Sequence, residues 1–326
     1  MRGGAQSGWN VYPSVHSGRK GEEMKQGFVS AILADHTLEE VLDFASENGF
    51  ECIEAACWPK GKAQRRYAGV THIDVDTLDA EGASHIRECC RKRKVQISAL
   101  SYYPNMMDPD PEKREFYICH LKKVIEASAM LGIYLVATFI GRMPAKGVEE
   151  NIKEYERVWK PIVQFAQERK VRIAIENCPM LFTADEWPGG HNLASTPPVW
   201  RRLFSIIDSE YLGLNYDPSH FVWQGINYIR PIYEFRDKIF HVHYKDIKLH
   251  REKLEEVGIL AEPLTFMTPR IPGHGDVNWG EYIAALKEIG YDGPACIEIE
   301  DKSFEGSGES IKDSLRISKR YLSQFV

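Results

Sequence analysis

Strand-like apolar runs alternate with amphipathic segments along almost the whole chain, from residue 25 onward. Each run is six to nine residues long and is followed by a segment with the spacing of a helix. Such alternation predicts parallel strands joined by right-handed crossovers. Eight such units follow one another, with apolar runs at residues 27–33, 51–57, 95–103, 133–140, 171–177, 212–217, 239–246 and 295–300.

Eight strand–helix units in about 300 residues predict a single-domain (β/α)8 TIM barrel over residues 25–326. A doubly wound sheet is the alternative, but the segment after its first strand would be rich in glycine, and "GFVSAILADHT" is not. Residues 1–24 lack periodicity and lack the apolar segment of a secretory signal, so we expect a flexible extension. The long insertion after the seventh strand, residues 254–279, is large enough for a lid.

The composition of the chain limits the classes of partner that the protein is expected to bind. The net charge of −6 and the pI of about 6.0 disfavour a nucleic acid, which attracts a basic surface. No apolar run reaches the roughly 18–20 residues of a membrane helix. The seven cysteines form an odd number and no C-x-x-C pair, so we expect reduced thiols in a cytoplasmic protein.

Ionisable side chains gather at the carboxyl ends of the last four predicted strands, where a TIM barrel carries its catalytic groups. His241 and His243 are two residues apart, so both point to one face of their strand. Taken singly, each residue is as readily a surface carboxylate or a core histidine. Together they form an oxygen-rich set that suits Mn²⁺, Co²⁺ or Mg²⁺. The groups are Glu176, Asp217, His220, His241, His243, Lys245, Asp246, Glu298 and Glu300.

Four of these strand ends carry a family resemblance. The segments "AIENCPM", "NYDPSH", "HVHYKD" and "IEIED" resemble the metal-dependent xylose-isomerase-like barrels, the sugar isomerase and epimerase superfamily, over about residues 25–324. The resemblance implies a divalent cation, foremost Mn²⁺ with Co²⁺, Mg²⁺ or Zn²⁺ as alternatives. It selects Glu298 over Glu300 and implies that His220 faces the substrate. The implied ligands are Glu176, Asp217, His243 and Glu298.

A cation that holds a sugar carbonyl and its neighbouring hydroxyl acidifies the C–H bond between them. A nearby base then removes that proton. His220, Glu176 and Glu298 are the candidate catalytic residues, and which one is the main base stays open. Side chains at the mouth of the barrel and in the insertion are candidate substrate contacts, although each aromatic is as readily ordinary loop packing. They are Lys245, Trp58, Tyr103, Trp223 and Arg270, with Tyr102 and Trp187 in the same aromatic group.

Longer phrases resemble one branch of the superfamily. "ACWPKGKAQRRYAGVTHIDVD", "SYYPNMMDPDPE", "FIGR", "ENCPM" and the insertion are similar to the catalytic α subunits of C-glycoside deglycosidases. This resemblance implies a lyase that cleaves the C–C bond of 3-oxo-C-glycosides by elimination. It also implies a small β subunit in a hetero-oligomer. The 3-oxo group makes the proton on C2 acidic. The proton removal that begins an isomerisation can therefore also begin this elimination.

Three other functions remain open. A sugar or sugar-phosphate isomerase or epimerase fits the same residues, although no clear Gly-rich loop is present for a phosphate. An abasic-site endonuclease shares the barrel, but it needs a three-zinc cluster with more histidines. The fourth predicted strand ends "ATFIGR" without one. A binding or scaffold protein that merely retained the ligands would be distinguished by its metal content.

Overall fold

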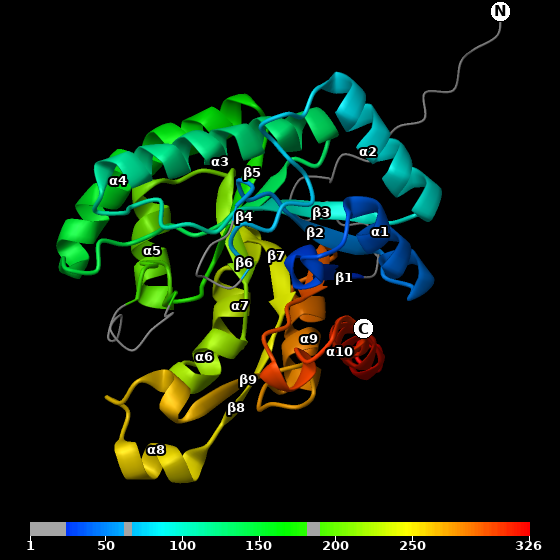
Figure 1. Ribbon diagram of the computed structural model, residues 1–326. Coiled ribbons are helices and arrows are strands. Elements are labelled where there is room, and N and C mark those ends of the chain that lie inside the picture. The colour runs from blue at the N-terminus through cyan, green and yellow to red at the C-terminus, as the bar shows by residue number, and fades with distance from the viewer. Residues whose placement is uncertain (1–23, 62–66, 181–189) are drawn as a thin grey trace, which may run out of the picture.

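The computed structural model describes residues 24–61, 67–180 and 190–326. Eight parallel strands close a barrel in the order β1-β10-β7-β6-β5-β4-β3-β2 (Figure 1), which confirms the predicted (β/α)8 fold. Residues 1–23 of the predicted extension, and Trp187, lie outside the described residues, whereas the last residue of that extension, Met24, is buried in the core. The barrel strands are β1 (Lys25–Val29), β2 (Cys52–Ala56), β3 (Gln96–Ser101), β4 (Leu135–Thr138), β5 (Arg172–Glu176), β6 (Leu212–Tyr216), β7 (Ile239–Tyr244) and β10 (Pro294–Ile297).

Helices surround the barrel and begin where the sequence supplies caps. Thr37 and Glu40 form a capping box at the start of α1, and Asp110 accepts hydrogen bonds from the first turn of α3. No helix in the described part of the chain is long and apolar enough to cross a membrane. The helices are α1 (Leu38–Glu47), α2 (Ala80–Arg93), α3 (Pro111–Leu131), α4 (Val148–Glu168), α5 (Pro197–Ile206), α6 (Ser219–Gln224), α7 (Arg230–Glu234), α8 (Arg251–Val257), α9 (Trp279–Glu288) and α10 (Gly308–Leu322).

All eight predicted strands extend past the observed ones, and the first and the eighth do so most, by four and three residues. The first stops at Val29, and Ser30–Leu33 form a 3-10 turn, η1, instead. The eighth stops at Ile297, so Glu298 lies in the loop just beyond it rather than in the strand. The backbone N–H of Glu298 still donates to the carbonyl of Tyr244 at the end of β7, 3.2 Å away. This bond keeps the carboxylate beside its neighbouring strand.

The insertion after β7 forms an antiparallel ribbon of β8 (Asp246–Leu249) and β9 (Met267–Arg270), which projects from the barrel together with α8 in Figure 1. Asp246 anchors the base of this ribbon. One oxygen of its carboxylate accepts from Val277 N, and the other accepts from Trp279 Nε1, 2.9 Å away. Burial raises the pKa of Asp246, against these hydrogen bonds, which lower it. Asp246 is therefore part of the scaffold.

Candidate metal centre

Four side chains from four neighbouring strands meet inside the mouth of the barrel. Glu176 ends β5, Asp217 follows β6, His243 lies in β7 and Glu298 follows β10. One potential ligand atom from each lies within 4.8 Å of all the others. All four side chains are buried or nearly so. The four residues predicted as metal ligands are therefore brought together, and their role as ligands stays a prediction.

The amide of Asn177 aligns the ends of β5 and β6. Its Nδ2 donates to the carbonyl of Asp217, and its Oδ1 accepts from Asp217 N at 2.8 Å. The Asp217 carboxylate turns back on its own loop, where Oδ1 accepts from Ser219 N at 2.7 Å. The carbonyl of Glu176 accepts from Asn192 Nδ2. The backbone next to both carboxylates is therefore fixed by side-chain amides.

The orientation of His243 is set from behind by Glu54, a buried residue of β2. His243 Nε2 donates to Glu54 Oε2 at 2.8 Å. The opposite ring nitrogen, Nδ1, faces Glu298 at 3.3 Å and Glu176 at 3.8 Å. A neutral imidazole with its proton on Nε2 presents a lone pair on Nδ1. The ring is therefore oriented as metal-binding histidines usually are, with a carboxylate on the far nitrogen.

Several buried polar atoms face the centre. Four buried atoms there make no hydrogen bond within the described part of the chain: Asp217 Oδ2, His220 Nε2, His243 Nδ1 and Glu298 Oε2. They face one another in two pairs, with His220 3.2 Å from Asp217 and His243 3.3 Å from Glu298. Buried polar atoms without partners cost free energy, on the order of 1–3 kcal/mol each, so a convergent set is unusual. A divalent cation would satisfy the carboxylate oxygens and Nδ1. The residues therefore fit a divalent cation, with three oxygen donors and one nitrogen donor.

A supporting network behind the centre was missed in the sequence analysis. Tyr103 donates its hydroxyl to Glu54 Oε1 at 2.8 Å, so both oxygens of Glu54 are bonded. Asn215 lies between the imidazoles of His241 and His243, at 3.0 and 2.9 Å. The one available signal was a glutamate inside the otherwise apolar strand "CIEAA". His241 lies deeper on the same strand face, as predicted from its spacing.

Opposite charges shift the pKa values of the buried groups. Burial would raise the pKa of Glu54, but the charge and hydrogen bond of His243 outweigh it and lower that pKa. Burial likewise opposes ionisation of Glu176, yet His220 and His243 hold the pKa of its carboxyl far below its usual range. Burial would lower the pKa of His243, while the surrounding carboxylates raise it well above its ordinary value. At neutral pH Glu54 and Glu176 are thus ionised, and Glu176 is ready to bind a cation.

A cavity of about 600 Å³ is lined at its base by three of the four candidate ligands, Glu176, His243 and Glu298. Three of the predicted aromatic contacts, Trp58, Tyr103 and Trp223, line it, and so does His220. The insertion supplies part of the wall through residues 262–264 and 267–269. Tyr102, by contrast, is fully buried behind Trp58 and packs edge-on against it.

The two predicted cationic contacts lie in different places. Lys245 lines the cavity and is almost buried, with Nζ 2.7 Å from Glu300 and 3.4 Å from Glu298. Burial would lower the pKa of Lys245, but these two carboxylates raise it well above its ordinary value. Arg270 is not brought to the cavity lining. Its Nη1 pairs with Asp301 at 3.2 Å and ties β9 to the loop after β10.

Comparison with known proteins identifies the family. Residues 42–321 match the family described as the xylose isomerase-like TIM barrel. The chain belongs to this family. It is 31% identical to an inosose dehydratase from Clostridium botulinum (strain Eklund 17B / Type B) over 284 residues, which are 81% of this chain and 86% of that protein.

Solved structures share the fold at lower identity. The IolI protein, whose crystal structure contains a zinc atom, superposes with a TM-score of 0.68 at 19% identity, over 93% of this chain and 99% of IolI. The 3-keto-D-glucoside 4-epimerase YcjR from E. coli superposes with a TM-score of 0.62 at 16% identity, over 91% of this chain and all of YcjR (100%). These likenesses show that the chain shares the barrel fold of these two proteins.

Proposed function

We propose that this protein is a divalent-metal-dependent lyase that removes the proton beside the carbonyl of a keto-sugar and expels a group from the β-position. The observation that carries this proposal is the convergence of buried atoms of Asp217, His243 and Glu298 that make no hydrogen bond within the described residues, next to Glu176 and the cavity. Similarity to inosose dehydratases, whose name describes an elimination, supports the lyase over a binding protein.

The side chains around the cavity have separate roles in the proposed reaction. A divalent cation at the centre would supply Lewis-acid stabilisation of the negative charge that develops on a sugar oxygen. His220 Nε2, which faces the cavity beside Glu176 and Asp217, accepts the proton from carbon. Burial would lower the pKa of His220, but Cys178 and Asp217 raise it well above its ordinary value in the metal-free protein, and a bound cation would offset their charge. The electrons of that C–H bond form the new double bond, and the leaving group departs with its bonding pair. Lys245 Nζ donates to a substrate oxygen and orients the ring.

The narrower form of the proposal is a C-glycoside deglycosidase α subunit that acts on 3-oxo-C-glycosides with Mn²⁺ and with a small β subunit. The resemblance of its loop phrases to those subunits supports this substrate. The aromatic wall formed by Trp58, Tyr103 and Trp223 suits an aryl leaving group. A 3-oxo group is required, because without it the C2 proton is not acidic.

The alternative is an isomerase or epimerase that removes the same proton and returns it to another face or carbon. The fold-level likeness to a 3-keto-D-glucoside 4-epimerase favours this alternative. Both reactions need the cation, the base and Lys245. They differ in whether a leaving group departs.

The test is incubation of the Mn²⁺-loaded chain in deuterated water with an inosose, a 3-keto-glucoside or a 3-oxo-C-glycoside, with and without a β subunit. Formation of a dehydrated sugar or of free aglycone, abolished by chelation and restored by Mn²⁺, supports the lyase. Cleavage of the C-glycoside supports the narrower form. Deuterium uptake without release identifies an isomerase or epimerase. Neither uptake nor release from any of the three rejects this substrate class.

A further inference from the structure

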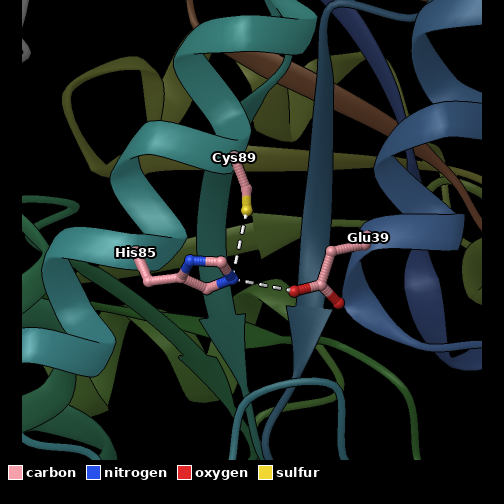
Figure 2. Close-up of side chains that lie close together, drawn as sticks. All are labelled: Glu39, His85 and Cys89. Carbon is pink, nitrogen blue, oxygen red and sulfur yellow. Dashed lines mark hydrogen bonds and ion pairs between the residues drawn. The ribbon is translucent and has the colours of Figure 1, made fainter.

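A second group of potential metal ligands lies outside the barrel, between helices α1 and α2. Figure 2 shows the carboxylate of Glu39 and the thiol of Cys89 both pointing toward the same ring nitrogen of His85. His85 and Cys89 are four residues apart on α2, so they share one face of that helix. Glu39 reaches them from the first turn of α1. One potential ligand atom from each lies within 4.8 Å of the other two.

The separations are close to those of a bound zinc ion. His85 Nε2 is 3.2 Å from Glu39 Oε1 and 3.5 Å from Cys89 Sγ. Tetrahedral zinc, with bonds of about 2.0–2.3 Å, holds neighbouring ligand atoms about 3.3–3.8 Å apart. Both distances thus need to change by only a few tenths of an ångström. The Glu39 side chain, 43% exposed, has room to rotate and bring its oxygen nearer the sulfur.

Neighbouring contacts hold the two helices together beside this group. The guanidinium of Arg93 on α2 donates two hydrogen bonds, of 2.6 and 3.0 Å, to the carboxylate of Asp43 on α1. The Arg93 guanidinium also donates to the carbonyl of Cys89. Cys89 is buried at the base of the group, whereas the imidazole of His85 faces solvent. The ligands are therefore preorganised on two rigid elements and open to an ion from solution.

We propose that Glu39, His85 and Cys89 form a second metal site, for a zinc-class ion, on the outer face of the barrel. Thiolate and imidazole select a softer ion than the oxygen-rich centre in the barrel mouth. Three protein ligands leave the fourth tetrahedral position to water. On binding, the thiol proton of Cys89 leaves to solvent, and the proton on His85 Nε2 moves to Nδ1. The ion then joins α1 to α2.

The test is a Co²⁺ titration of the metal-free full-length protein, followed by the near-ultraviolet charge-transfer band of a cobalt–thiolate bond. The wild type is expected to show this band, to bind two equivalents of Co²⁺ in all, one of them at the barrel centre, and to lose the band when Zn²⁺ is added. H85A and C89S are expected to lose the band and one equivalent of bound metal. His85 is largely exposed, so H85A leaves packing intact. Turnover is expected to stay unchanged in both variants.

Two further cysteines serve as controls. Cys119 is an exposed thiol on α3, 3.2 Å from the Glu115 carboxylate, and belongs to no ligand group among the described residues. Cys178 lies in the barrel mouth, close to Glu176 and His220. C119S and C178S are both expected to keep the band. Absence of a band in the wild type, its persistence in C89S, or its loss in C178S would overturn the proposal.

Discussion

The two sides of the barrel mouth differ in how their polar atoms are satisfied. On the side of β5, β6, β7 and β10, buried atoms of Asp217, His243 and Glu298 face the centre and make no hydrogen bond within the described residues. On the side of β2 and β3, both oxygens of Glu54 are hydrogen-bonded, to His243 and Tyr103. A cation would satisfy the atoms on the first side, whereas the oxygens of Glu54 on the second side are already hydrogen-bonded and orient His243. Substitutions on the two sides are therefore expected to have different consequences.

The largest loss of metal and of turnover is expected from substitutions on the side of β5, β6, β7 and β10. Glu298→Gln removes a negative charge that faces His243 Nδ1 at 3.3 Å, so metal content and turnover are expected to fall to background. Glu300→Gln is the matched control, because Glu300 also contacts Lys245, at 2.7 Å, but is not one of the four grouped ligands. Metal analysis and turnover in Mn²⁺ measure both variants. A greater loss in Glu300→Gln would mean that Glu300 is the ligand.

A smaller effect is expected for His220, which faces the same centre but is not among its four predicted ligands. His220→Ala is expected to lower kcat by roughly 10²–10⁴-fold, the usual contribution of a general base. Metal content is expected to stay at the wild-type level, because the four candidate ligands remain. Near-normal kcat in this variant would transfer the role of base to Glu176 or Glu298.

Glu54 tests the supporting side. Glu54→Gln keeps the size of the side chain but removes the charge that holds His243 Nε2 at 2.8 Å. Loss of such a partner typically lowers metal affinity by about 10–100-fold, so we expect weaker binding with the fold retained. Tyr103→Phe removes only one hydrogen bond to Glu54 and is expected to cost less. Competition with a chelator measures both affinities, and equal losses would show that the charge of Glu54 is unimportant.

The contrast between the two sides also explains what the sequence could predict. Three of the candidate ligands, Glu176, Asp217 and Glu298, lie at the carboxyl ends of apolar runs. These ends of parallel strands lie together at one end of a barrel, so the fold itself predicts that the three side chains are close to one another. Glu54 lies inside its strand, and a buried charge is predictable only when its partner is known. That partner, His243, is 189 residues away.

Side-chain placement in the loops and on the outer helices was not predictable in the same way. Arg270 and Lys245 are both cations near the mouth, but only local pairing decides which one faces the cavity. Arg270 turns to Asp301. Nothing in the sequence predicts that Glu39 and His85 are close together, because the packing of two helices rather than the end of a strand brings them into contact.

The smallest effect expected is a proton linkage that couples the two sides. In the metal-free protein the surrounding carboxylates raise the pKa of His243 well above its ordinary value, so the imidazole is protonated at neutral pH. A cation can bind Nδ1 only after that nitrogen loses its proton, so each ion bound releases about one proton. Apparent affinity is then expected to rise by up to about tenfold per pH unit while the pH stays below that raised pKa. Calorimetry in two buffers of different ionisation enthalpy measures the released proton. Glu54→Gln removes one of the charges that raise this pKa, so fewer protons are expected to leave. A heat of binding that is independent of the buffer would show that His243 is already neutral before the cation arrives.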